Sequence, residues 1–153
     1  MGGSEGCESA LGRLATSRET PAPETPAAEA EGIVVGTVRT TGRLIGPAGS
    51  ADVEFVVDTG STATKIDARL GQRLGLVPIG TDEVELADGT VVTWPVAEAR
   101  LELPERPGRI VTIQCWITPQ NGEALLGIVA LEAMLLQVDP VRRRLTPVRG
   151  LAL

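Results

Sequence analysis

Residues 53–62 read Val53-Glu54-Phe55-Val56-Val57-Asp58-Thr59-Gly60-Ser61-Thr62. Apolar side chains alternate with polar ones and then run without a break up to Asp58, a pattern typical of a β-strand whose end is buried. Such a strand would carry the carboxylate of Asp58 to a protected place and not to the open surface. Burying an unpaired carboxylate is costly, so proteins accept that cost mostly where the group serves chemistry.

The triplet Asp58-Thr59-Gly60 suits such a site. Gly60 has no side chain, so the chain can turn sharply there and the Gly60 N–H can approach the carboxylate. The hydroxyls of Thr59 and Ser61 can donate hydrogen bonds nearby. The competing interpretation is an ordinary surface turn, which uses the same residue types. The apolar strand before the triplet argues against that interpretation, because a surface turn would have polar flanks.

A second element lies downstream and reads Ala124-Leu125-Leu126-Gly127. Together with the Asp58 loop it resembles the retropepsin-like aspartic proteases, and most of all their bacterial stand-alone members. In that family a hydrophobic-hydrophobic-Gly element packs beside the catalytic loop and precedes a short helix and a final pair of strands. Residues 128–145 follow in the same order, although residues 125–136 could also form one core helix. The resemblance covers residues 32–148.

The expected fold is mostly β: a small, closed, retropepsin-like acid-protease β-barrel with one or two short helices and half an active site in each chain. Alternating segments predict a first strand at residues 32–39 and a strand at residues 51–58 that feeds the site. A glycine-rich connection is expected between them, at residues 40–50. Residues 96–103 and 109–117 predict a longer hairpin.

A short helix is predicted over residues 68–74. Asp67 is a favoured N-cap residue, since its side chain can accept a hydrogen bond from the first turn. Gly75 can adopt the left-handed conformation that ends a helix.

A tight hairpin is predicted where residues 83–86 and 91–94 flank Ala87-Asp88-Gly89-Thr90, because Asp-Gly between two alternating runs is a strong hairpin signal. The resemblance implies that this hairpin is the flap that closes over substrate. Its tip is less glycine-rich than the tips of viral retropepsins, and Ile128 stands where a polar residue often follows the glycine. These departures bear on flap mobility and substrate range and leave Asp58 untouched.

The resemblance assigns roles residue by residue. Those implied to be catalytic are Asp58, Thr59 and Gly60. Those implied to contact substrate are Gly60, Ser61, Ala87, Asp88, Gly89 and Thr90. Those implied to support the site are Ser61, Thr62, Leu125, Leu126 and Gly127.

Composition excludes several other classes of protein. The chain has no histidine, so hydrolases with a histidine base, histidine-ligated zinc sites and imidazole proton shuttles are impossible. No metal or cofactor is expected. A Ser-Lys hydrolase using Ser61 and Lys65 does not fit the Ser-x-x-Lys spacing. The net charge of -6 and the 2% aromatic content argue against nucleic-acid binding, and the basic residues 142–144 fit a solvated hairpin end.

The N-terminal residues 1–31 are rich in Pro, Ala, Gly, Ser and Glu and predict a disordered tail, which leaves residues 32–153 as one retropepsin-like domain. The tail has no secretory signal and Gly6 breaks a myristoylation pattern. With no apolar run long enough to span a bilayer, no membrane association is expected. Cys7 and Cys115 form no disulfide framework, so we expect a cytoplasmic protein.

The single Asp-Thr-Gly predicts the quaternary structure. The mechanism implied by the resemblance needs two facing carboxylates, one acting as a base toward water and the other as an acid toward the scissile carbonyl. We therefore expect a homodimer in which two Asp58 carboxylates form an aspartic endopeptidase site for an extended peptide or protein. Residues 145–153 are the candidate interface, limited by Pro147. The alternative is a weakly active or inactive retropepsin-like module for dimerisation or peptide binding.

Overall fold

The computed structural model describes residues 37–119 and 122–152. Their strands are β1 (Arg39–Gly46), β2 (Gly49–Val57), β3 (Thr64–Asp67), β4 (Gly80–Glu85), β5 (Val91–Glu102), β6 (Ile110–Thr118), β7 (Ala124–Leu126), β8 (Leu136–Asp139) and β9 (Arg144–Pro147). Their helices are α1 (Ala68–Leu74) and α2 (Ile128–Met134). The expected tail at residues 1–31 lies outside the described residues.

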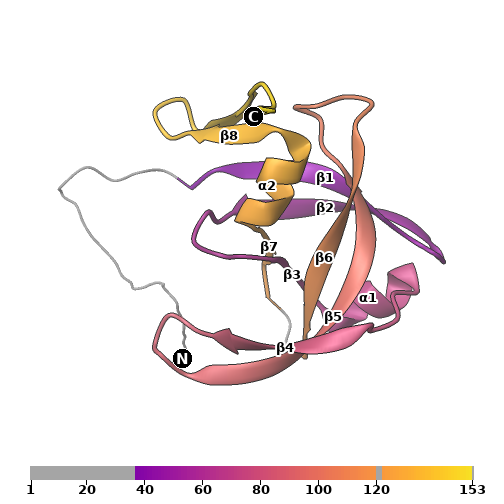
Figure 1. The fold of residues 1–153 in the computed structure, drawn as a ribbon. Helices are drawn as coiled ribbons and strands as arrows, with labels where there is room; N and C mark the ends of the chain where they lie inside the picture. The colour runs from indigo at the N-terminus through magenta and orange to yellow at the C-terminus, as the bar shows by residue number, and fades with distance from the viewer. Residues whose placement is uncertain (1–36, 120–121, 153) are drawn as a thin grey trace. The chain divides into compact units, whose positions relative to one another are not determined.

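Six strands close into a barrel (Figure 1). Neighbouring strands pair in the order β1-β2-β7-β3-β6-β5, and a further pairing of β5 with β1 completes the ring. β4 pairs only with β5 and extends the sheet beyond the barrel as one arm of a hairpin. The prediction of a closed, mostly β barrel with two short helices is confirmed.

Alternation along the strands fills the interior of the barrel. β2 shows the alternation predicted from the sequence, with Val53 and Phe55 buried and Asp52 and Glu54 exposed. Phe55 and Leu126 have no exposed surface, so the strand that leads to Asp58 and its neighbour β7 are anchored in the core. Burying one such side chain contributes about 1.5–3 kcal/mol.

β1 differs from the expectation. The glycine-rich segment predicted as a connection forms this strand, which pairs with β2 around a turn between Gly46 and Gly49. The reason is packing at Gly42, where a Cβ atom would lie 2.6 Å from Leu103 Cδ2 and 3.3 Å from Phe55 Cε2. Gly42 therefore allows the side chains of neighbouring strands to approach β1 closely and does not form a turn. Of the predicted strand at residues 32–39, residues 32–36 lie outside the described residues.

The predicted helix over residues 68–74 is confirmed as α1, with the expected ends. The Asp67 side chain accepts a hydrogen bond from the Leu70 N–H at 2.8 Å. Gly75 has a φ of 72° and closes the last turn. The local capping signals therefore determined this element.

The predicted tight hairpin is also confirmed, as β4 and β5. Gly89 has a φ of 86°, and the Leu86 N–H donates to the Thr90 carbonyl at 2.7 Å across the turn. β5 continues through Pro95 into the longer hairpin with β6, so the tight hairpin and the barrel share one strand. Pro95 pairs with Thr81 of β4 and precedes the first β5–β6 pair, which joins Val96 to Trp116, so it has a strand neighbour on one side only.

The expected order of β7, a short helix and two strands is confirmed, and residues 125–136 are not one helix. α2 runs from β7 to β8, as Figure 1 shows. The Arg106 guanidinium donates to the carbonyls of Met134 at 3.2 Å, Leu135 at 3.1 Å and Val148 at 2.8 Å. Arg106 thus fixes the C-terminal hairpin to the β5–β6 turn.

β9 pairs with β8 of the same chain, and the basic residues 142–144 lie at the exposed end of that hairpin. Whether residues 145–153 form an interface stays a prediction. None of the helices in the described part of the chain is long and apolar enough to cross a membrane.

Candidate active site

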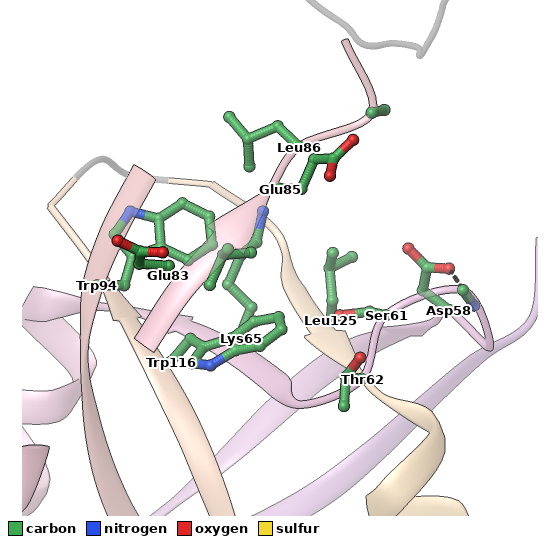
Figure 2. Close-up of a pocket in the computed structure, with 13 residues that line it drawn as sticks. Asp58, Ser61, Thr62, Lys65, Glu83, Glu85, Leu86, Trp94, Trp116 and Leu125 are labelled. Carbon is green, nitrogen blue, oxygen red and sulfur yellow. Dashed lines mark hydrogen bonds between the residues drawn. The ribbon is translucent and has the colours of Figure 1, made fainter. Parts of the chain in front are cut away.

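Asp58 directly follows β2, and hydrogen bonds fix its backbone on both sides. The Asp58 N–H donates to the Leu126 carbonyl at 3.0 Å, and the Asp58 carbonyl accepts from the Ser61 N–H at 3.1 Å. The Gly60 N–H donates to Asp58 Oδ1 at 3.0 Å. A dashed line at Asp58 marks this hydrogen bond in Figure 2. Asp58 is half-buried. The loop therefore orients a carboxylate that stays within reach of a ligand.

The start of α2 supports the far side of this loop. The Ile128 N–H donates to the Ser61 carbonyl at 2.8 Å, and the Val129 N–H donates to the Thr62 carbonyl at 3.2 Å. β7, which leads into the helix, pairs in parallel with β2 and antiparallel with β3. The first free N–H groups of the helix are thereby satisfied, and the loop is held from two directions.

A cleft of about 740 Å³ opens beside Asp58. It is lined by Asp58, Gly60, Ser61, Thr62, Lys65, Glu83, Val84, Glu85, Leu86, Ala87, Trp94, Trp116 and Leu125. These residues come from the Asp58 loop, from β3, β6 and β7, and from the β4–β5 hairpin. Within residues 37–119 and 122–152, no group of three or more His, Cys, Asp or Glu side chains could hold a metal ion.

Two tryptophans form one wall of the cleft. The rings of Trp94 and Trp116 lie 6.1 Å apart between centroids at an interplanar angle of 53°, within the range of favourable aromatic pairs. The Trp116 indole N–H donates to Asp82 Oδ2 at 2.8 Å, which ties the wall to β4. The wall therefore has a fixed shape and a polar attachment to the hairpin.

Lys65 lies between this wall and Asp58 (Figure 2). Its Nζ is 5.8 Å from the centroid of the Trp94 ring. Burial lowers the pKa of Lys65 from its ordinary value of 10.5, while the negative charges of Asp58 and Glu123 oppose that shift. A cation thus lies in the same cleft as the candidate catalytic carboxylate.

The structure brings most of the predicted site residues together. Those that line the cleft are Asp58, Gly60, Ser61, Thr62, Leu125 and Ala87. Those behind the loop are Leu126, which is fully buried, and Gly127. Thr59 is exposed beside them. Those at the exposed hairpin tip, outside the set that lines the cleft, are Asp88, Gly89 and Thr90.

The hydrogen bond expected from the Ser61 hydroxyl is made to the backbone of the loop and not to the Asp58 carboxylate. Ser61 Oγ donates to the Ala63 carbonyl at 2.8 Å, and a hydroxyl has only one proton to give. Ser61 therefore stabilises the turn of the loop. Because its proton is already donated to a carbonyl, a Ser61–Lys65 nucleophile gains no support from this geometry.

Sequence reasoning missed several cleft residues: Lys65, Glu83, Glu85, Leu86, Trp94 and Trp116. Alternation along β3 could have indicated the position of Lys65. Thr64 and Ile66 are buried on one face of the strand, so Lys65 must point to the other face. The neighbours of Lys65 could not be predicted from the sequence. Lys65 lies opposite Trp116 and Leu125 because β3 pairs with β6 and β7, which are distant in the chain.

Comparison with known proteins identifies the family. The pattern of the aspartyl protease family matches residues 40–130, more than half of the chain, and the matched span contains the Asp58 loop, the hairpin and β7. The chain belongs to the aspartyl protease family. No curated protein matches this chain.

Three solved structures are similar to this aspartyl protease family member. The retroviral protease-like domain of Ddi1 from Leishmania major is 14% identical, with 74% of this chain and 88% of that chain covered and a TM-score of 0.48. A retropepsin-like aspartic protease from Rickettsia conorii is 16% identical, with 68% and 85% covered and a TM-score of 0.45. Lpg0085 from Legionella pneumophila, of unknown function, is 16% identical, with 68% and 92% covered and a TM-score of 0.43. The prediction of an aspartic protease family is confirmed by the family match over residues 40–130.

Proposed function

We propose that this aspartyl protease family member is a homodimeric aspartic endopeptidase that uses Asp58 of each protomer. The observation that carries the proposal is the position of the Asp58 carboxylate, which is oriented by the Gly60 N–H at 3.0 Å and opens onto the cleft. Glu83 and Glu85 line the same cleft but are exposed side chains of the hairpin. Asp58 is therefore the carboxylate whose position is best fixed for chemistry.

A second protomer would complete the site. The 153 residues contain one Asp-Thr-Gly, and hydrolysis of an amide by two carboxylates needs one as base and the other as acid. Thr59 and Gly60 are exposed, and Val129, at the start of α2, has 49% of its surface exposed. These exposed groups next to Asp58 are available for contact with a partner loop.

In the dimer, the ionised Asp58 removes a proton from water while the protonated Asp58 of the other protomer donates its proton to the peptide carbonyl oxygen. The water oxygen bonds to the carbonyl carbon and gives a tetrahedral diol. Transfer of a proton to the peptide nitrogen then allows the C–N bond to break. The reaction uses no metal, cofactor or covalent intermediate, and the peptide would lie extended along the cleft, beside the β4–β5 hairpin.

A cytoplasmic location is part of the proposal. Its support is Cys115, which is free and lies in the core on β6. A small buried thiol of this kind suits a compartment that keeps cysteines reduced.

The test is cleavage of a mixed peptide library by wild-type protein and by three matched neutral variants of cleft carboxylates. Asp58→Asn keeps the acceptor for the Gly60 N–H and should reduce cleavage by about a hundredfold or more, since it removes the acid-base group. Glu83→Gln and Glu85→Gln remove the same charge from the same cleft and should retain clear cleavage. Undiminished cleavage by pure Asp58→Asn protein would refute the catalytic role and leave the peptide-binding module.

A further inference from the structure

Lys65 has an unusual place for a lysine. It is the only lysine in the chain, and it is half-buried in the wall of the cleft that also contains Asp58. Lysine is almost never buried without a partner, because transferring the ammonium group out of water is costly. The position therefore calls for a physical explanation.

No carboxylate in the described residues neutralises Lys65 directly. The ion pairs within 4.0 Å among residues 37–119 and 122–152 all involve arginine, and Lys65 has none of them. Glu123, one of the two carboxylates close enough to influence Lys65, is paired with Arg39 at 2.9 Å. Within the described part of the chain, the ammonium group therefore has no bonded anion.

The surroundings of Lys65 place its ammonium group in the cleft, beside an aromatic ring. Its Nζ lies 5.8 Å from the Trp94 ring centroid, a distance at which the face of the ring attracts a cation. Burial lowers its pKa, and the negative charges of Asp58 and Glu123 oppose this shift without reversing it. Leu125 and Trp116 are its partners in the neighbouring strands, so the stem of the side chain has apolar neighbours and only its end is polar.

We propose that Lys65, with Trp94 and Trp116, forms a subsite that binds a carboxylate of the peptide substrate close to the scissile bond. The inference rests on the proposed peptidase function, because it takes the cleft to be the substrate site. The ligand chemistry is an acidic side chain, Glu or Asp, whose stem lies against the tryptophan wall while its carboxylate meets the ammonium. A free C-terminal carboxylate has the same chemistry and is distinguished by the test.

Glu83 and Glu85 are the competing determinants. They line the same cleft and would favour a basic side chain. Both are exposed on β4, where water screens their charges, whereas Lys65 is half-buried and its interactions are screened less. Preference for an acidic residue is therefore expected to prevail at the subsite next to Asp58.

The experiment uses a peptide library in which each Glu-containing peptide has two twins, identical peptides with Gln or Lys in place of that Glu. All of these peptides are amidated at the C-terminus, and a second set has the same sequences with a free C-terminal carboxylate. Wild-type protein should cleave one class of Glu peptides with a kcat/KM about tenfold above that of the Gln twins, as expected for one partly desolvated charge pair. Amidation should not remove this preference. Cleavage that needs a free C-terminus would overturn the side-chain assignment.

Variants locate the preference. Lys65→Met keeps the length of the side chain and should equalise the Glu and Gln peptides, whereas Lys65→Arg should retain the preference. Arg69→Met, which removes one positive charge from the exposed side of α1, is the matched control and should keep the wild-type ratio. A Glu preference that persists in Lys65→Met, its absence in wild type, or a preference for the Lys twin would each overturn the inference. The wild-type comparison stands even if Lys65→Met fails to fold.

Binding separates this inference from the proposed function. Asp58→Asn protein should bind a fluorescent Glu peptide about tenfold more tightly than its Gln twin, and the added Lys65→Met substitution should remove the difference. If no peptide is cleaved but this difference is found, the peptidase proposal fails while the carboxylate subsite holds. If peptides are cleaved without any charge preference, the subsite fails while the peptidase proposal holds.

Discussion

Gly127 packs so closely against Ala63 that a Cβ atom on Gly127 would lie 2.4 Å from the Ala63 carbonyl oxygen. The same atom would lie 2.8 Å from the Thr62 carbonyl oxygen. Gly127 has a φ of -86°, which any residue can adopt, so the requirement for glycine comes from space and not from backbone conformation. The neighbours are backbone atoms and cannot rotate away.

Gly127→Ala should therefore displace the loop that follows Asp58. We expect a loss of about 1–3 kcal/mol in the free energy of unfolding, as for other overpacked sites, together with a marked loss of peptide cleavage. Urea unfolding and a peptide assay measure the two effects. Gly80→Ala is the control, because nothing lies within 4 Å of a Cβ atom there. Equal stability and activity of the two variants would contradict the packing argument.

The proposed half-site in each protomer predicts that inactive subunits reduce the activity of the wild-type subunits with which they pair. Adding excess Asp58→Asn protein to wild type should form mixed dimers with one catalytic carboxylate, so activity should fall toward the fraction of all-wild-type dimers. Activity per subunit should also fall on dilution. Sedimentation at the same concentrations provides the dimer content. A fully active monomer would refute the shared site.

The pH dependence of cleavage should be bell-shaped and lie on the acid side of neutrality. In the proposed dimer, activity would need one proton shared by the two Asp58 carboxylates, so it would fall at low pH when both are protonated and at higher pH when the shared proton is lost. No histidine is present to add a limb near neutrality. Cleavage of one fluorogenic peptide at constant ionic strength, with dimer content checked at each pH, is the measurement. A rate that rises steadily into alkaline pH would exclude the shared proton.

Arg106→Met should destabilise the C-terminal hairpin. The substitution removes three charge-assisted hydrogen bonds to the carbonyls of Met134, Leu135 and Val148, and we expect a loss of about 1.5–3 kcal/mol. Arg109→Met is the comparison, since Arg109 donates to the single carbonyl of Ala133 at an exposed position and should cost less. Thermal unfolding ranks the two variants, and the reverse order would contradict the role of Arg106.

Cys115 should resist alkylation in the folded protein. Burial raises the pKa of its thiol to about 12, and only the thiolate reacts. Because the folded pKa is raised, the stability from this buried thiol is present below the ordinary value of 9.0 and is lost as pH rises through about 12. In a Cys7→Ser background, iodoacetamide should label the protein only after urea unfolding. Rapid labelling of the native protein at neutral pH would show that the site is open.

Local patterns in the sequence predicted the elements that local physics controls. The apolar run before Asp58 predicted β2, Asp67 and Gly75 predicted both ends of α1, and Asp88-Gly89 predicted the turn of the β4–β5 hairpin. Periodicity, capping and turn conformation depend on residues only a few positions apart. A single sequence therefore contains the information that these features need.

The role of Gly42 could not be predicted from the sequence, because it depends on residues that are distant in the chain. Its lack of a side chain is typical of a turn, but in the fold it lets β1 approach Leu103 and Phe55. The Ser61 hydroxyl likewise donates to Ala63, and not to Asp58, because of the path that the loop takes. Close approach between strands is set by partners distant in the chain.

The sequence by itself determined the carboxylate, the loop that orients it and the hairpin beside it. Only the tertiary structure decided what faces that carboxylate. Lys65, Trp94 and Trp116 come from β3, β5 and β6, and they meet because closure of the barrel fixes the registers between these strands. Such registers depend on the combined packing of the whole core, so no local pattern could place the cation beside the aromatic wall.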